Sequence, residues 1–161
     1  DAVVLPAGNG TLLLGAHLGF SELAAAGIIE KPPRLVAVQA AGCAPLVSAF
    51  QAGWQGIEPV ETSATLAEGI AIAAPVRASQ MLAAVRETGG RFLAVDEVEI
   101  AEALLAVGRQ GFCIEPTSAA VVAGLKIYLA DSPSDELVVS VFTGHGLKAA
   151  STIQQLLSSS G

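Results

Sequence analysis

The chain has 161 residues, enough for one domain with a hydrophobic core, and its 52% hydrophobic and 14% charged residues exclude a disordered protein. Its net charge of −7 argues against a nucleic-acid binder, because the chain brings no basic patch to neutralise phosphates. No uninterrupted apolar run reaches the ~18 residues of a membrane span, so no membrane partner is expected.

Hydrophobic periodicity and capping signals predict strands that alternate with helices. In chain order, the expected elements are strand 2–6, helix 11–26, strand 34–39, a helix from Pro45 to Gly53, an irregular loop 54–63, helix 75–88, strand 91–95, helix 96–109, an extended piece 112–115, helix 116–129, strand 137–142, helix 149–157 and a frayed tail 158–161. Residues 65–70 are ambiguous between a short helix and a loop. Asp96 and Glu99 match a capping box at the start of their helix.

The predicted strands are continuous apolar runs, a pattern typical of an α/β domain whose mostly parallel sheet is buried on both faces. We therefore expect residues 1–161 to form a single three-layer αβα domain. Ligands of such sheets bind beyond the carboxyl ends of the strands. The first strand ends at residues 8–11 and the fourth at residues 143–146, so both loops are expected at that edge if the two strands are parallel.

The two cysteines, Cys43 and Cys113, stand far apart and lack the Cys-x-x-Cys or His-rich company of a metal site. We expect two buried, reduced thiols, which predicts a cytoplasmic protein without a bound metal. The high apolar content further predicts that part of the surface is covered by another segment or by a second subunit.

The loop Gly8-Asn9-Gly10-Thr11 leads from a buried strand into the N-terminus of a helix. Free backbone N–H groups and the positive end of the helix dipole suit such a loop to a phosphate, with the Thr11 hydroxyl beside it. The alternative is a tight turn with Asn9 in a left-handed conformation. The loop is neither a Walker loop nor a dinucleotide fingerprint, because no Gly-Lys-Ser/Thr follows and Gln39 stands where an acidic residue would end the second strand.

Other polar residues accompany the two loops. His145, between glycines, is expected to shape its loop or line a pocket rather than to act as a general base. Lys148 follows and is expected to interact with a carboxylate. Glu115 precedes Pro116, and two roles stay open for it: capping the next helix or lining a pocket. No lysine stands in the setting of a Schiff-base lysine, so no catalytic residue is expected within the chain.

Five segments occur in the order known from one enzyme family. They are Leu5–Thr11, Pro33–Pro45, Thr65–Ile70, Glu115–Ala119 and Thr143–Lys148. Together they resemble the C-terminal half of the threonine synthases, pyridoxal-phosphate lyases of the tryptophan synthase β-like fold (fold type II).

The resemblance implies that the chain is the large cofactor-binding domain of such an enzyme. Cofactor-binding roles carry over to Gly8, Asn9, Gly10 and Thr11 at the phosphate, to Thr143 at the pyridine nitrogen, to Glu115 near the ring and to the 67–69 stretch that lines the cofactor. A neutral hydroxyl at the pyridine nitrogen does not enforce ring protonation as an aspartate would, which suits elimination and replacement chemistry.

The family converts O-phosphohomoserine and water to threonine and phosphate in threonine biosynthesis. Its Schiff-base lysine and the groups that clamp the substrate carboxylate lie in an N-terminal segment that this chain does not contain. By this resemblance we expect a piece of a longer two-domain, homodimeric enzyme, inactive alone, whose partners are a small amino-acid substrate and the missing N-terminal segment.

Two alternative functions stay open. One is a serine or threonine dehydratase of the same fold. Such relatives usually have a longer glycine run in the phosphate loop and a Ser-Gly-Gly-type second loop, so Gly8–Thr11 and Thr143–Lys148 favour the synthase. The other is a non-catalytic domain that binds a phosphate ligand and has lost the lysine.

Overall fold

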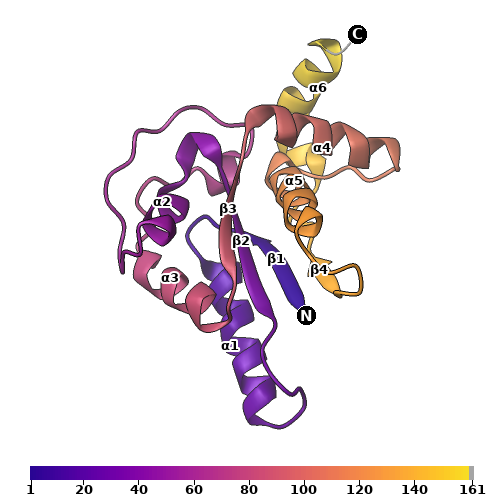
Figure 1. Ribbon diagram of the computed structural model, residues 1–161. Coiled ribbons are helices and arrows are strands. Elements are labelled where there is room, and N and C mark those ends of the chain that lie inside the picture. Colours follow the sequence, from indigo (N-terminus) through magenta and orange to yellow (C-terminus); the bar gives the residue numbers. More distant parts are fainter. Residues whose placement is uncertain (160–161) are drawn as a thin grey trace.

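The computed structural model describes residues 1–159 and has three layers, with a parallel sheet between two layers of helices (Figure 1). Over that range the strands are β1 (Ala2–Pro6), β2 (Arg34–Ala40), β3 (Arg91–Val95) and β4 (Val138–Ser140). The α-helices are α1 (Thr11–Ala25), α2 (Pro45–Gln51), α3 (Ala78–Glu87), α4 (Glu97–Arg109), α5 (Pro116–Ala130) and α6 (Ala150–Ser159). Short 3-10 segments cover Ala41–Cys43, Glu68–Ile70 and Gly146–Ala149. The predicted α/β architecture is confirmed.

The strand order in the sheet is β3-β2-β1-β4, and each neighbouring pair is parallel. β1 pairs with β2 from Ala2↔Arg34 onward and with β4 from Ala2↔Val138 onward. The chain therefore adds β2 and β3 on one side of β1 and then returns to place β4 on the other side. The strand order reverses between β1 and β4, which makes that junction the topological switch point of the sheet.

The central strand β1 is buried over its whole length and divides two cores. Val3 and Leu5 face α1, α2 and α3, whereas Ala2 and Val4 face α5, which carries α4 on its outer side (Figure 1). α5 lies close to the sheet, since a Cβ on Gly124 would stand 2.5 Å from Val38 Cγ2. Burial on both faces explains why the strands read as continuous apolar runs.

Several elements differ from the sequence prediction by one to three residues, and three differences have a visible physical reason. α3 begins at Ala78 rather than at Pro75. The Ala78 N–H donates to the Pro75 carbonyl at 3.1 Å, and this bond closes a turn before the helix starts. β4 ends at Ser140 rather than at residue 142, and soon afterwards the Thr143 N–H donates to Ser118 Oγ on α5 instead of to a strand. The extended piece 112–115 contributes only an isolated antiparallel bridge between Ile114 and His145.

Two smaller expectations are also wrong. Cys43 is buried as predicted, but Cys113 is exposed. Residues 158 and 159, expected in a frayed tail, belong to α6; residues 160 and 161 lie outside the described part of the chain. The ambiguous 65–70 segment contains a 3-10 turn at Glu68–Ile70.

The predicted capping box is confirmed at the start of α4. Asp96 accepts the Glu99 N–H at 2.8 Å, and the Glu99 carboxylate accepts the Asp96 N–H at 2.8 Å. We expect Asp96→Ala to lower the free energy of unfolding by about 1 kcal/mol, because an N–H of the first turn loses its acceptor. Urea denaturation measures the change. Glu102→Ala, at an exposed site on the same helix, should stay within about 0.5 kcal/mol; equal losses in both variants would contradict the capping role.

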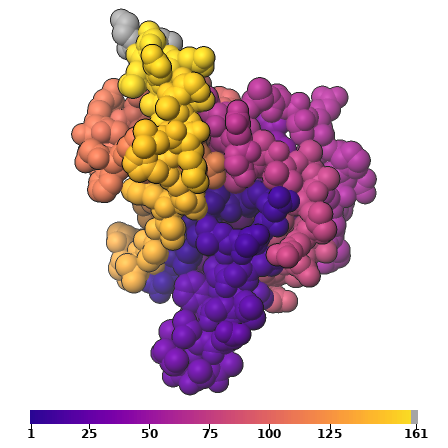
Figure 2. Space-filling model, turned by 180° about the vertical axis from the view of Figure 1, so that it is seen from behind, coloured from indigo at the N-terminus to yellow at the C-terminus, as the bar shows by residue number. Residues whose placement is uncertain are grey.

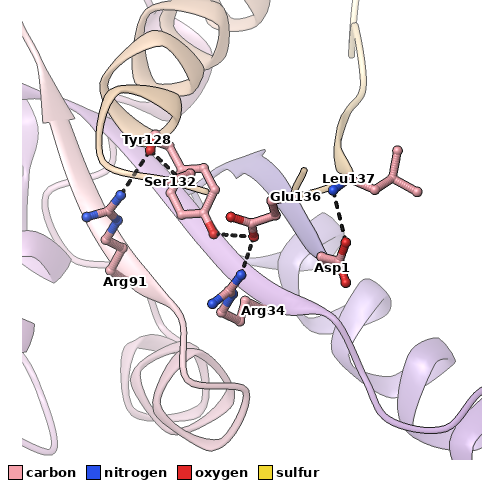
Figure 3. A network of polar contacts seen from close by, with 7 residues as sticks. All are labelled: Asp1, Arg34, Arg91, Tyr128, Ser132, Glu136 and Leu137. Atoms are coloured by element: carbon pink, nitrogen blue, oxygen red, sulfur yellow. Dashed lines mark hydrogen bonds and ion pairs between the residues drawn. The ribbon is translucent and has the colours of Figure 1, made fainter. Parts of the chain in front are cut away.

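A polar network joins β2, α5 and the start of β4 at the amino edge of the sheet (Figure 3). The Glu136 side chain is 3% exposed and its Oε1 accepts the Tyr128 hydroxyl at 2.7 Å and the Arg34 guanidinium. The hydrogen bond from Tyr128, followed by that from Arg34, lowers the pKa of Glu136 from its ordinary value of 4.5. Asp1 Oδ2 accepts the Leu137 N–H at 2.9 Å, which fixes the same entry to β4.

The lowered pKa of Glu136 predicts a pH-dependent contribution to stability. A carboxylate with a depressed folded-state pKa stabilises the fold above its unfolded value of 4.5, and this contribution is lost as the pH falls through the folded-state pKa. We expect Tyr128→Phe to destabilise the chain at pH 7 and to cost progressively less below pH ~4.5. Denaturation at a series of pH values tests this. Ser140→Ala, which removes a hydroxyl bonded to the neutral Val4 carbonyl at 3.0 Å, should cost the same across that range.

Within residues 1–159, no helix combines the length and apolar character needed to cross a membrane. The same described residues contain no group of three or more His, Cys, Asp or Glu side chains placed to hold a metal ion.

Candidate functional site

Two loops flank the topological switch point at the carboxyl edge of the sheet. β1 and β4 are parallel neighbours, so the loop of residues 7–11 after β1 and the loop of residues 143–146 after β4 leave the same edge. In the space-filling view, the C-terminal segment runs beside the N-terminal part of the chain (Figure 2). Open parallel sheets bind ligands in the crevice at this place. The prediction that both loops share one edge is confirmed.

The first loop ends at an uncapped helix N-terminus. Gly10 is the N-cap of α1, no side chain caps the helix, and no acidic residue lies in its first turn. Asn9 and Thr11 are exposed beside it. The left-handed position is Gly10, with φ 88°, and not Asn9, so the sequence-based alternative placed this conformation one residue too early. The loop therefore presents unshielded N–H groups and the positive helix end to an anion.

Close packing favours glycine at both positions of this loop. A Cβ on Gly10 would lie 2.5 Å from Met81 Sδ, and a Cβ on Gly8 would lie 3.0 Å from the Gly69 carbonyl oxygen. A Cβ on Gly69 would in turn lie 2.7 Å from Thr117 Oγ1 on α5. The phosphate-loop candidate, the 65–70 segment and the start of α5 thus meet at one place.

Gln39 holds the first loop in position. Its side chain is fully buried, donates to the Ala7 carbonyl at 3.2 Å, and accepts the Leu46 and Val47 N–H groups at 2.9 and 3.2 Å. It caps α2 and ties that helix to the loop after β1. Gln39 stands where a dinucleotide fingerprint would have an acidic residue, and its role in this chain is structural.

The second loop brings Thr143 and Glu115 together. Thr143 is exposed, and its Oγ1 donates to Glu115 Oε1 at 2.9 Å. The Glu115 N–H donates to the Gly144 carbonyl at 3.0 Å, and a Cβ on Gly144 would stand 2.2 Å from the Glu115 carboxyl carbon. Glu115 is the N-cap residue of α5, but its side chain makes no capping bond. Of the two roles left open for Glu115, capping by the side chain is not observed, and the carboxylate bonds Thr143 instead.

Two further residues of this loop lie as expected. Lys148 Nζ stands 3.5 Å from Glu115 Oε2, an ion pair in which the lysine side chain is 69% exposed and the glutamate side chain 17%. His145 Nδ1 accepts the Leu147 N–H at 3.2 Å and so shapes the turn into the following 3-10 segment.

The sequence interpretation assigned no role to Ser118. This residue is fully buried in the first turn of α5, and its hydroxyl contacts Thr143 and Gly144. Its position inside the Glu115–Ala119 segment was the only available signal, since a serine near a helix start is usually read as a local capping residue.

The residues at this edge fit pyridoxal phosphate, the cofactor that the resemblance implies. The uncapped N-terminus of α1 suits its phosphate, and no carboxylate in the first turn opposes that charge. The exposed Thr143 hydroxyl, on the loop after the neighbouring strand, suits a pyridine nitrogen. Glu115, the residue expected near the ring, is hydrogen-bonded to the Thr143 hydroxyl.

A family model described as "Pyridoxal-phosphate dependent enzyme" matches residues 1–144. The threonine synthase of Methanosarcina acetivorans is 38% identical over 156 residues, which are 95% of this chain and 38% of that protein. The threonine synthase of Methanocaldococcus jannaschii is 38% identical over 92% of this chain and 37% of its own length. The chain thus spans less than half the length of these curated relatives.

Solved structures share the fold. The threonine synthase of Escherichia coli has a TM-score of 0.69 at 19% identity, covering 98% of this chain and 35% of that chain. A fungal L-serine ammonia-lyase from Rhizomucor miehei has a TM-score of 0.73 at 21% identity, covering 96% of this chain and 49% of that chain. These likenesses confirm the predicted fold type. Since the family model covers nearly the whole chain, the protein belongs to the family of pyridoxal-phosphate dependent enzymes.

Proposed function

We propose that this chain is the cofactor-binding domain of a threonine synthase, which converts O-phosphohomoserine and water to threonine and phosphate. The observation that carries the proposal is the pairing of an uncapped helix N-terminus after β1 with the Thr143 hydroxyl after β4, at the switch point of the sheet. The 38% identity to two archaeal threonine synthases supports this substrate over that of a dehydratase of the same fold.

Each candidate residue has a defined task in this proposal. Gly8, Asn9, Gly10 and Thr11 bind the cofactor phosphate through backbone N–H groups, the helix dipole and the Thr11 hydroxyl. Thr143 donates its hydroxyl proton to the pyridine nitrogen.

In the structure, Glu115 accepts the Thr143 hydroxyl proton and Lys148 pairs with the same carboxylate, which keeps the threonine side chain at this edge. Because a hydroxyl has one proton, Thr143 releases Glu115 in order to donate to the pyridine nitrogen when the cofactor binds. When bound, pyridoxal phosphate supplies the electron withdrawal on which elimination and replacement depend.

The lysine that bonds covalently to the cofactor lies, in this proposal, outside the chain. Lys31 stands in the connector that leads into the amino end of β2, and Lys126 lies within α5. Lys148 is near the site but is paired with Glu115. We infer that residues 1–161 are one α/β domain of a longer two-domain enzyme and do not turn over substrate alone, in keeping with the 38% share of the relatives' length that the chain matches.

An absorbance titration with pyridoxal phosphate, followed by borohydride reduction and mass spectrometry, tests the proposal. We expect saturable binding without a lysine adduct, because in this proposal the two loops bind the cofactor and no lysine is placed to react. Lys148→Met serves as the matched variant, since it removes the one lysine beside the site. It should bind the cofactor with only modestly altered affinity.

Three outcomes would contradict the proposal, and the first is that the chain binds no pyridoxal phosphate. An adduct on Lys148 of the wild-type chain, lost in Lys148→Met, would make the chain self-sufficient for covalent attachment. Binding of inorganic phosphate with no preference for pyridoxal phosphate would instead favour a non-catalytic phosphate-binding domain.

We further propose that the protein works in the cytoplasm as a homodimer. Support for the dimer comes from an apolar groove of about 540 Å³ between α1 and β4, where Leu12, Val139 and Val141 are 40%, 49% and 46% exposed. Light scattering coupled to gel filtration measures the mass. A chain that stays monomeric at high micromolar concentration would contradict self-association through this domain.

A further inference from the structure

The hydroxyl of Ser118 is directed entirely at the second loop. Ser118 is 0% exposed, and its Oγ accepts the Thr143 N–H at 2.9 Å and the Gly144 N–H at 3.4 Å. It also lies 3.1 Å from Thr143 Oγ1. Three contacts thus join one buried side chain of α5 to two consecutive residues after β4.

Other serines at helices of this chain behave differently. The hydroxyls of four of them donate to the carbonyl four residues earlier, which is the usual local bond of a helical serine: Ser21 to His17, Ser48 to Ala44, Ser132 to Tyr128 and Ser158 to Gln154. Ser118 instead makes three hydroxyl contacts with residues far away in the chain. A serine that only filled space in the core would not need hydrogen bonds to a distant loop.

Counting protons assigns a direction to the network. Ser118 Oγ receives two N–H groups, so both its lone pairs are engaged and its own proton is donated to Thr143 Oγ1. Thr143 Oγ1 then accepts from Ser118 and keeps its own proton for an outward acceptor. In the structure that acceptor is Glu115 Oε1 at 2.9 Å.

We propose that Ser118 is a positioning residue that fixes the second loop and makes the Thr143 hydroxyl a hydrogen-bond donor toward the cofactor ring. This proposal rests on the proposed function, in which Thr143 meets the pyridine nitrogen. A donor at that atom favours the unprotonated ring nitrogen, because a protonated nitrogen needs an acceptor. Ser118 acts through Thr143 and does not touch the cofactor.

The variant Ser118→Ala tests the proposal in the chain as it stands, with Ser132→Ala as the control. Ser132 also loses one hydroxyl, but its hydroxyl bonds the Tyr128 carbonyl at the other end of α5. Three quantities are measured: hydrogen exchange of the Thr143 and Gly144 amides, the χ1 rotamer of Thr143 from NMR couplings, and the dissociation constants for pyridoxal phosphate and for inorganic phosphate.

We expect Ser118→Ala to raise amide exchange at Thr143 and Gly144 about tenfold, since two hydrogen bonds of moderate strength are lost. Thr143 should sample more than one χ1 rotamer. The dissociation constant for pyridoxal phosphate should rise about tenfold, whereas that for inorganic phosphate, which needs only the Gly8–Thr11 loop, should stay unchanged. Ser132→Ala should alter none of these quantities.

Several results would overturn the positioning role. Unchanged exchange and rotamer in Ser118→Ala would do so. Equal weakening of both ligands would show a general loss of structure, and raised exchange with unchanged cofactor affinity would show a structural bond only. If the wild-type chain binds no pyridoxal phosphate, the proposed function fails, while exchange and the Thr143 rotamer still decide for or against Ser118. Should Ser118→Ala not fold, slow exchange at both amides of the wild type supports the proposal and fast exchange overturns it.

Discussion

Replacing Gly144 with alanine is expected to weaken the binding of pyridoxal phosphate by about tenfold to a hundredfold, the equivalent of the strain of one extra methyl group in a packed site. The new Cβ would lie 2.2 Å from the carboxyl carbon and from Oε2 of Glu115. That carboxylate is held by Thr143 and Lys148, so relief of the clash displaces either the carboxylate or the loop that carries Thr143. The titration with pyridoxal phosphate measures the loss.

The fold itself should tolerate Gly144→Ala better than the site does, because the atoms that collide belong to the end of a side chain. Gly19→Ala is the matched control: Gly19 lies within α1, and its new Cβ would meet no atom within 4 Å. That variant should gain up to about 1 kcal/mol of stability and bind the cofactor as the wild type does. Unaltered cofactor affinity in Gly144→Ala would contradict the assignment of this loop to the site.

The largest loss of stability is expected from Gly90→Ala. A Cβ on Gly90 would lie 1.8 Å from the Leu35 carbonyl oxygen and 2.7 Å from its carbonyl carbon, which are backbone atoms of the buried strand β2. No side-chain rotation relieves such a contact, so β3 has to move away from β2. We expect the free energy of unfolding to fall by about 3 kcal/mol or more and the melting temperature by about 10 °C.

Thermal unfolding followed by circular dichroism measures this effect. Gly108→Ala provides the comparison, because Gly108 lies inside α4, where an added Cβ meets no atom within 4 Å. That variant should be more stable than the wild type by up to about 1 kcal/mol. A melting temperature of Gly90→Ala equal to that of the wild type would contradict the close approach of these two strands.

Local sequence signals predicted most element boundaries. Pro45 and Pro116 stand in the first turns of α2 and α5, and Asp96 with Glu99 opens α4 as expected. These signals are reliable because the groups that satisfy a helix end lie within a few residues of it. The helix start predicted at Pro75 was wrong because proline also suits a turn. The contacts that decide between a turn and a helix start come from elsewhere in the fold.

The location of the candidate site was partly predictable. Glycine loops after apolar strands predict a ligand edge once the strands are parallel, and the sequence supplied both loops, including Gly10 and Thr143. That β4 returns to the far side of β1 depends on contacts between residues more than a hundred positions apart, such as Val4 and Ser140. No local pattern encodes that strand order.

The amino-acid sequence by itself determined the class of fold, the two glycine loops and, through resemblance, the cofactor family. Only the tertiary structure decided what Glu115 and Ser118 do. Read locally, Glu115 could cap α5 or line a pocket, and Ser118 stood near the same helix start without an assigned role. In the folded chain, burial of α5 against the sheet brings the loop after β4 over that helix start, and the backbone N–H groups and hydroxyl of the loop need partners there. The competition between a local cap and a distant loop is resolved by packing, which sequence spacing does not reveal.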